Sequence, residues 1–385
     1  MLRQLVAFLS ATVLAGAAWA GDYTITGIGM EYSASSAAAI NNSGQVVGHV
    51  RVGNNYHAVV SNAGVVTDLG TFGTTDSQAR DINDSGNILV AAGTSYCYQG
   101  FVSFNNPTDY YLLGNSTQSR ISQGYATVVS RLSNNGTAMG NYEYVEPDGV
   151  YYPETKYGVA IGGGTTTPLP NWQTWNSGTA YLGGPNPDYP VETYSEARDI
   201  SDSGLIVGGC YGFETSGACM WRNGQITYLS GQHLIEAKAV NASGKIAGVM
   251  YVNSQVRMFV WDNGTVADLG MPGGNRQFDY YDTWAMNDSG VIVGSGFDTT
   301  SRTYTPFIVL DGTIRDLNTL LPANSGWQLT SVNDINEQGQ IVGNGIAPDG
   351  TTRGFLLQPV PEPASMLLLL AGGGVLLRRR TTSGN

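Results

Sequence analysis

Short apolar segments alternate with glycine-containing turns along most of the chain, and one phrase recurs among them. The phrase is an apolar residue, Asn or Ser, any residue, usually Ser, Gly, any residue, two small or apolar residues and usually a second Gly. Its first copy spans residues 40–48, and the turn glycines of all copies are Gly44, Gly86, Gly136, Gly204, Gly244, Gly290 and Gly339. Asn and Ser favour tight turns, and Gly supplies the positive φ that a hairpin needs. Each copy therefore predicts two short strands joined by a tight turn.

A second pair of apolar segments follows each phrase. In one repeat, residues 259–264 end in a turn at Asn263-Gly264, and a further apolar segment occupies residues 266–270. The matching stretches in other repeats are residues 58–70, 101–114, 159–169, 220–229 and 307–317. One repeat therefore predicts four short strands. Four-stranded units that recur at the spacing of the seven turn glycines are typical of a β-propeller, whose radial repetition protects the sheet edges.

The two ends of the repeat region predict how the ring closes. After Gly339 the last copy offers only one further apolar segment, residues 354–357, and no fourth strand. Residues 23–29 at the start resemble the missing fourth strand, so their pairing with the last repeat would complete seven units. The sequence therefore predicts an all-β, seven-bladed β-propeller of four-stranded blades over residues 21–358, closed by the N-terminal strand.

Composition supports a globular β-protein and excludes some partners. The chain has 385 residues with 52 Gly, 42% hydrophobic and 12% charged residues, which is typical of a turn-rich protein with a core. Its formal net charge of −12 argues against nucleic acids and anionic membrane surfaces, because both are bound through clusters of Lys and Arg.

The N-terminus has the pattern of a secretory signal peptide. Arg3 precedes an apolar run over residues 5–18, and Ala18-Trp19-Ala20 then forms an A-x-A cleavage site. A membrane-spanning helix is the alternative, but it requires about 20 apolar residues and a stop-transfer flank. We therefore expect residues 1–20 to be removed on export.

The C-terminus combines Pro361-Glu362-Pro363, an apolar run over residues 364–377 and a basic cluster, Arg378, Arg379 and Arg380. Residues 359–385 thereby resemble the PEP-CTERM sorting signal of exported Gram-negative proteins. A 14-residue helix is about 21 Å long, short of a roughly 30 Å hydrocarbon core, so we expect a weak or transient transmembrane anchor in the inner membrane. The positive-inside rule places the preceding chain outside the inner membrane. The resemblance implies cleavage near the Pro-Glu-Pro motif by an exosortase-type transpeptidase; an ordinary C-terminal anchor is the alternative.

The repeats carry a second resemblance. The phrases His57-Ala58-Val59-Val60 and, ten residues on, Thr67-Asp68-Leu69-Gly70-Thr71-Phe72 are similar to the HAF-repeat family of extracellular proteins. The resemblance spans nearly all of residues 21–358, although only the first copy retains the family's His, at His57. It implies an extracellular compartment, but it does not point to a particular biochemical activity.

Length variation between repeats indicates where a ligand would bind. In a four-stranded blade, the turns between strands one and two and between strands three and four lie on one face of the ring, and these turns are uniformly short. The long connections belong to the opposite face and cover residues 141–156, 170–196 and 271–283. Variable connections on a constant scaffold commonly carry function. The candidate ligand-binding residues there are Tyr142, Tyr144, Tyr151, Tyr152, Trp172, Trp175, Tyr181, Asp188, Tyr189, Asp279, Tyr280, Tyr281 and Asp282.

These residue types suit a sugar polymer, although coverage of the scaffold and a protein contact are alternatives. Aromatic faces stack on sugar rings while carboxylates bind hydroxyls, and aromatic residues are also enriched in protein interfaces. We expect no cofactor. The acidic pairs Asp199 with Asp202 and Asp279 with Asp282 are candidates for Ca²⁺ ligands, but such pairs are more often turn residues.

Motifs for catalysis are scarce. The only histidines are His49, His57 and His233, and no H-E-x-x-H, G-x-S-x-G or phosphate-binding loop is present. We therefore expect a non-catalytic protein.

The three cysteines allow three disulfide pairs. Cys210 and Cys219 flank one connection between adjacent strands, and their pairing in an oxidising compartment would leave Cys97 as a free or intermolecular thiol.

Together these expectations describe an exported protein of the cell surface or extracellular matrix that binds extracellular polysaccharide in a biofilm. The link to exopolysaccharide rests partly on the resemblance to the PEP-CTERM signal. A carbohydrate-active hydrolase or lyase on the propeller scaffold is one alternative, and a protein-interaction scaffold is another.

Overall fold

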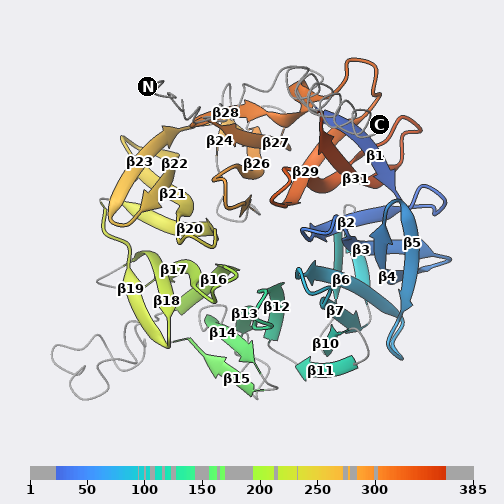
Figure 1. Ribbon diagram of the computed structural model, residues 1–385, viewed down its shortest axis with the longest axis horizontal. Coiled ribbons are helices and arrows are strands. Elements are labelled where there is room, and N and C mark those ends of the chain that lie inside the picture. The colour runs from blue at the N-terminus through green and yellow to red at the C-terminus, as the bar shows by residue number, and fades with distance from the viewer. Residues whose placement is uncertain are drawn as a thin grey trace, which may run out of the picture.

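Seven antiparallel sheets stand in a ring around a central channel (Figure 1). The computed structural model describes residues 23–360 except for residues 94, 99–100, 105–108, 115–117, 123–126, 144–155, 163–164, 170–193, 212–215, 232, 272–275, 278–283 and 299–301. Six of the sheets have four strands, and the seventh has a short fifth strand. The chain is therefore a seven-bladed β-propeller, which confirms the fold predicted from the repeat.

Each blade follows one repeat of the sequence, from an inner strand at the channel to an outer strand. Blades one to three contain β2 (Ser35–Ile40), β3 (Val46–Val52), β4 (Asn55–Asn62), β5 (Val65–Gly70); β6 (Asp76–Ile82), β7 (Ile88–Gly93), β10 (Asp109–Leu113), β11 (Gln118–Ser122); β12 (Thr127–Leu132), β13 (Ala138–Glu143), β14 (Lys156–Gly162) and β15 (Thr165–Pro168). Blades four and five contain β16 (Tyr194–Ile200), β17 (Ile206–Tyr211), β18 (Gly217–Arg222), β19 (Gln225–Tyr228); β20 (Leu234–Val240), β21 (Ile246–Val252), β22 (Gln255–Asp262) and β23 (Thr265–Gly270). Blades six and seven contain β24 (Arg276–Gln277), β25 (Trp284–Met286), β26 (Ile292–Asp298), β27 (Thr303–Leu310), β28 (Thr313–Asp316); β29 (Gln328–Ile335), β30 (Ile341–Ile346), β31 (Thr352–Pro359) and β1 (Tyr23–Ile28).

The N-terminal strand closes the ring. β1 lies antiparallel to β31 in a register that runs from Tyr23 opposite Pro359 to Ile28 opposite Gly354. The last blade therefore takes its fourth strand from the start of the chain, as the orphan segment at residues 23–29 predicts. A 3-10 turn, η2 (Leu317–Leu320), leads from blade six into blade seven.

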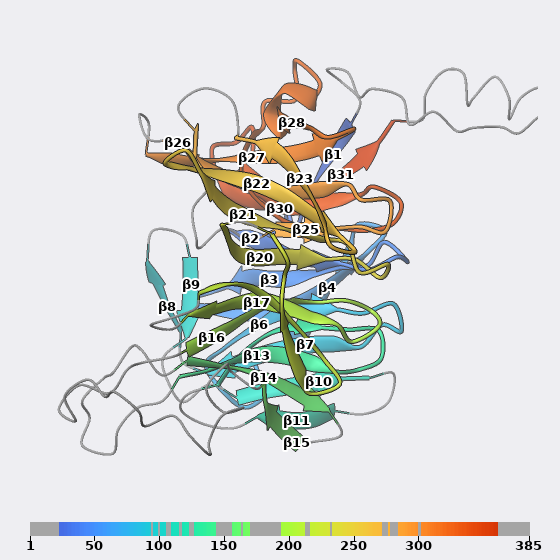
Figure 2. The same cartoon turned by 90° about the vertical axis from the view of Figure 1, so that its left-hand side faces the viewer.

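Blade two departs from the strand assignment expected from its sequence. The segment expected to be its third strand is β9 (Phe101–Phe104), which pairs with β8 (Ser95–Tyr98) in a separate hairpin. The third strand is β10 instead, because its residues continue the ladder with β7, and β11 supplies the fourth. The expected range 101–114 is therefore wrong for this blade. Figure 2 shows the extra hairpin at one side of the ring.

The recurring phrase forms the turn between the first and second strands. Asn41 Oδ1 accepts hydrogen bonds from the backbone N–H groups of Ser43 (3.1 Å) and Gln45 (3.0 Å), and Gly44 adopts a φ of +75°. The second glycine of the phrase is required by the close approach of the neighbouring strand. A Cβ at Gly48 would lie 2.0 Å from the carbonyl oxygen of Ser36 on the inner strand, so a larger residue would force the two strands apart.

The hydrophobic core lies between neighbouring blades. At the junction of blades seven and one, Ile28, Ile40, Val46 and Val342 pack together. Similar apolar clusters fill the other junctions, and the channel at the centre is polar. No helix among the described residues is long and apolar enough to cross a membrane, and the C-terminal segment predicted to do so lies outside them.

Candidate functional site

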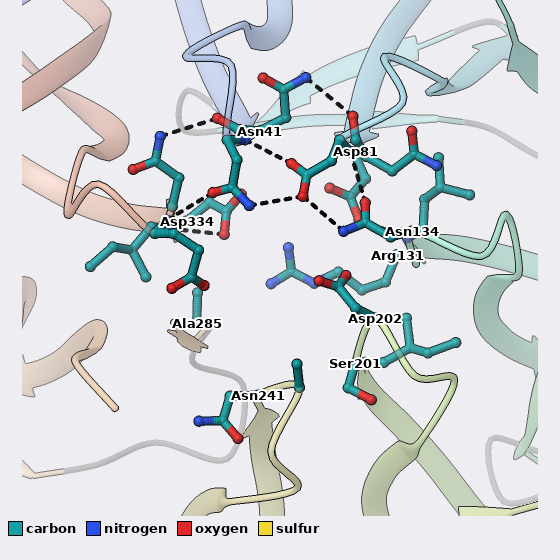
Figure 3. Close-up of a pocket in the computed structure, with 18 of the residues that line it drawn as sticks. Asn41, Asp81, Arg131, Asn134, Ser201, Asp202, Asn241, Ala285 and Asp334 are labelled. Atoms are coloured by element: carbon teal, nitrogen blue, oxygen red, sulfur yellow. Dashed lines mark hydrogen bonds between the residues drawn. The ribbon is translucent and has the colours of Figure 1, made fainter. Parts of the chain in front are cut away.

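The channel opens into a cavity of about 140 Å³ on the face formed by the short turns, which we call the tight-turn face (Figure 3). Its walls are the ends of the seven inner strands and the turns that follow them. Sequence reasoning placed the candidate site on the opposite face, which we call the long-connection face. The sequence pattern therefore did not predict this cavity.

Three aspartates bridge neighbouring blades deep in this cavity. Asp81 Oδ1 accepts the N–H of Ile82 (2.9 Å), and its Oδ2 accepts the N–H of Leu132 in blade three (2.7 Å). Asp199 joins blade four to Val240 of blade five by the same pattern, and Asp334 joins blade seven to blade one. We call these residues the bridging aspartates. All three stand two residues before the Asn or Ser of the recurring phrase.

Arg131 occupies the same position of the repeat in blade three and reaches into the middle of the cavity (Figure 3). Its Nε lies 3.8 Å from Asp199 Oδ1, and each of the two side chains is only 14% exposed. Its Nη2 donates to the carbonyl oxygen of Trp284 in blade six, 3.4 Å away. One guanidinium group therefore faces three carboxyl groups and connects blades on different sides of the channel.

Burial dominates the acidity of these carboxyl groups. It raises the pKa of Asp81 from its usual 3.8 to about 7 and that of Asp199 to about 6, while the charge of Arg131 and the backbone N–H donors oppose the rise. The pKa of Asp334 is raised for the same reason. The neighbouring carboxyl groups hold the guanidinium charged, so the pKa of Arg131 is raised despite its burial.

A belt of asparagines runs around the same face. Asn41 Nδ2 donates to the carbonyl oxygen of Asn83 in the next blade (3.1 Å), and Asn83 in turn donates to Ser133 (3.1 Å). The equivalent bonds, from Asn241 to Asn287, from Asn287 to Asn336 and from Asn336 to Asn41, are 3.3, 3.2 and 3.1 Å long. Ser133 and Ser201, which replace Asn in two copies, bond within their own turns instead. The phrase therefore joins blades as well as strands.

An acidic rim surrounds the mouth of the cavity. The residue after the turn Asn or Ser is acidic in four blades, and these residues are Asp84, Asp202, Asp288 and Glu337. Their oxygens accept hydrogen bonds from the neighbouring blade, as Asp84 does from the backbone N–H of Asn42 (2.8 Å). Burial and the nearby carboxylates raise the pKa of Asp202 and of Glu337.

The hydrogen bonds of the bridging aspartates indicate a structural role for their carboxyl groups. Both oxygens of each carboxyl group are bound to backbone N–H groups of two blades, so the group holds the junction between them. Within the described residues, no three His, Cys, Asp or Glu side chains are arranged to bind a metal ion. Asp199 lies on β16 and accepts the N–H of Val240 in the next blade, and Asp202 belongs to the acidic rim.

Charged side chains also connect the inner strands of blades four and five. Arg198 pairs with Glu196 and with Glu236 of the next blade, and Lys238 Nζ lies 3.1 Å from Glu236 Oε2. The Glu236 and Lys238 side chains are 0% and 1% exposed. Buried ion pairs therefore join blades four and five.

The predicted ligand-binding residues fall almost entirely outside the described part of the chain. Tyr142 lies on the backbone of β13, and the other twelve belong to residues 144–155, 170–193 and 278–283. The strands that flank these segments are described. β24 pairs with Phe297 and Asp298 of β26, and β25 pairs with the same strand from Gly294. The described strands on either side of residues 278–283 therefore both belong to blade six.

Most of the exposed large apolar side chains of the described residues lie on the long-connection face, distributed over several blades. Six lie at strand ends or connections there, and they are Met30, Val52, Val128, Tyr251, Tyr304 and Ile346. On the tight-turn face, Val65 and Val360 are the exposed large apolar residues within the described chain. Tyr304 also contacts Phe297, with ring centroids 5.2 Å apart. Among the described residues, most exposed large apolar side chains therefore lie on the long-connection face, and the acidic rim lies on the tight-turn face.

Cys210 and Cys219 lie on adjacent strands, as the sequence predicts. Their sulfur atoms are 2.6 Å apart, and both are buried thiols in this structure. Burial, together with the neighbouring Cys210 thiol, raises the pKa of Cys219. The disulfide between them stays a prediction. The Cys97 side chain lies outside the described part of the structure.

Comparison with known proteins supports the fold alone. No protein-family model and no curated protein sequence matches the chain. An acylaminoacyl peptidase from Pyrococcus horikoshii is similar in structure, with a TM-score of 0.53 and 9% identity, over 91% of this chain and 55% of that one. The propeller domain of a trilobed protease from Pyrococcus furiosus gives a TM-score of 0.38 at 10% identity, over 74% of this chain and 97% of that one. This chain spans about half the length of the acylaminoacyl peptidase, and the likeness concerns the fold only.

Proposed function

We propose that this chain is an exported, non-catalytic binding protein of the cell surface or extracellular matrix, and that it binds extracellular polysaccharide through its long-connection face. The observation that carries the proposal is the contrast between the two faces. Six exposed apolar side chains and the strand ends that flank residues 144–155, 170–193 and 278–283 lie on one face of a closed ring. A closed ring that presents Tyr251 and Tyr304 on one face suits a repeating polymer, because each sugar ring offers an apolar face for stacking.

The compartment belongs to the proposal as well. The A-x-A site at Ala18 and Ala20 and the Pro361-Glu362-Pro363 motif support export followed by processing by an exosortase-type enzyme. All the strands of the ring lie between Tyr23 and Pro359, so removal of both terminal segments leaves the propeller complete.

Binding is tested by mixing residues 21–360 with the exopolysaccharide of the source organism and measuring co-sedimentation and polymer length in one sample. We expect saturable co-sedimentation with unchanged length. Trp172→Ala with Trp175→Ala, and separately Tyr251→Ala, should weaken binding. The matched control is Val65→Ala, which removes a 69% exposed side chain from the opposite face.

A second candidate function has one observation in its favour. Asp81 and Asp199 have pKa values of about 7 and 6 within one cavity, and groups that titrate near neutrality suit general acid and base catalysis. A hydrolase or lyase would shorten the polymer, and Asp199→Asn would abolish the shortening. If the polymer is neither bound nor shortened, the proposal fails, and a scaffold for protein partners becomes the better hypothesis.

A further inference from the structure

The bridging aspartates combine three features in one cavity. Each carboxyl group spans a junction between two blades, with N–H donors from its own blade and from the next at 2.7 to 2.9 Å. The three junctions are those between blades two and three, four and five, and seven and one, so they are spread around the ring. The third of them is the junction beside the N-terminal strand.

The cavity holds little positive charge to balance these groups. At the corresponding repeat position, β2, β20 and β25 present the uncharged residues Ala39, Ala239 and Ala285, and β12 presents Arg131. The acidic rim adds four further carboxyl groups, Asp84, Asp202, Asp288 and Glu337, at the mouth. Arg131 is thus the single cation among the residues described as lining the cavity.

We infer that Arg131 and the three bridging aspartates form a proton-sensitive lock on the ring, which tightens when protons enter the cavity and loosens when they leave. Arg131 balances part of the negative charge of three buried carboxyl groups. A proton bound by a bridging aspartate weakens one of its two N–H bonds, but it removes one negative charge from the enclosed space that the three carboxyl groups share and so lowers the repulsion among them.

The direction of the effect follows from linkage. An unfolded aspartate titrates near 3.8, whereas burial raises the pKa of Asp81 to about 7 and that of Asp199 to about 6 in the folded ring. Between these values the folded state binds more protons than the unfolded state. The free energy of unfolding therefore falls as pH rises from about 4 to about 7, and this contribution is fully present only at the acidic end.

Arg131 makes the inference specific to this cavity. Replacement of Arg131 by Met removes the counter-charge, so ionisation of the bridging aspartates becomes more costly at neutral pH. The loss of stability should then be large at pH 7.5 and should be mostly recovered at pH 5, where the carboxyl groups are protonated. A side chain with a packing role alone would cost the same amount at both pH values.

The test measures urea unfolding of the full chain at pH 5 and pH 7.5. For the wild type we expect the folding equilibrium constant to be more than about tenfold larger at pH 5. The ratio should grow in R131M and shrink in D81N and in D199N. Arg222→Met and Asp311→Asn are matched controls, because both residues are exposed on the tight-turn face. Equal ratios in R131M and the wild type, or a wild type that is more stable at pH 7.5, would overturn the inference.

A second measurement covers the case in which R131M does not fold. Calorimetric unfolding of the wild type at pH 6 in buffers of different ionisation enthalpy gives the number of protons released on unfolding. We expect release of about one proton or more, and a smaller release in D199N. The lock is rejected if unfolding of the wild type releases no protons. It is also rejected if D199N releases as many protons as the wild type and the control Asp311→Asn do.

Discussion

His57 Nδ1 lies 2.7 Å from Asp68 Oδ2 and thereby connects β4 to β5, the third and fourth strands of blade one. The other carboxylate oxygen of Asp68 accepts the backbone N–H of Gly70 (2.7 Å). Blade five repeats the arrangement with a different cation: Arg257 Nη2 lies 2.9 Å from Asp268 Oδ2, and Asp268 Oδ1 accepts the N–H of Gly270 (2.8 Å). The Asp of the Asp-Leu-Gly phrase therefore links the third and fourth strands of its blade.

Asp68→Ala should cost more stability than His57→Ala. The ion pair is partly exposed, with side chains 21% and 39% exposed, so it contributes little on its own. Loss of Asp68 also leaves the Gly70 N–H without its acceptor, and we expect a total of about 1 kcal/mol, against at most about 0.5 kcal/mol for His57→Ala. Urea unfolding of both variants measures the difference. Equal costs would show that the bond to Gly70 contributes nothing.

Asn83→Ala should weaken the joint between blades two and three. Asn83 Nδ2 donates to the Ser133 carbonyl oxygen, and Asn83 Oδ1 accepts the N–H of Asn87 (2.9 Å) within the turn. Both bonds are buried or nearly so, and we expect a loss of about 2 kcal/mol in the free energy of unfolding. Asn83→Ser, which imitates the natural copies at Ser133 and Ser201, should keep the turn and lose the joint, at about half that cost.

The control for this prediction is Asn62→Ala, because Asn62 is exposed at the end of β4. Its cost should be within about 0.5 kcal/mol of zero. If Asn83→Ser were as stable as the wild type, the asparagine belt would be irrelevant to stability.

Removal of β1 should open the ring. The strand pairs with β31 along six residues, and Arg353 donates to the carbonyl oxygens of Gly29 and Tyr32 just beyond it. A chain that begins after Ile28 leaves Phe355 and Leu357 without their cover and exposes the edge of β31. We expect faster proteolysis within β29–β31 than within blades three to five. Hydrogen exchange measures the corresponding loss of protection. Uniform protection would show that closure through β1 is dispensable.

The sequence predicts the elements whose information is local. Tight turns and the blade count follow from a phrase of nine residues and its copies, and the N-terminal closure follows from the missing fourth strand of the last repeat. The bonds between blades do not, because Asn41 meets Asn83 and Asp81 meets Leu132 only after the ring has formed. The shared repeat position of Asp81, Asp199 and Asp334 was the available signal for the cavity. In blade two, the apolar run of β9 resembles a third strand, and only pairing with β7 distinguishes β10 from it.

The Cys210–Cys219 disulfide is predicted to form while blade four folds. In the folded blade both sulfur atoms are buried, and burial raises the pKa of the Cys219 thiol, which disfavours the thiolate that attacks an oxidant. Refolding the reduced chain in a glutathione redox buffer should therefore give the disulfide, whereas adding the same buffer to the reduced, folded protein should give it much more slowly. The intact mass falls by two hydrogens when the bond forms, and Cys210→Ser is the control for pairs that involve Cys97. Equal rates from the folded and unfolded states would show that burial does not protect the thiols, and mass loss in Cys210→Ser would assign the bond to another pair.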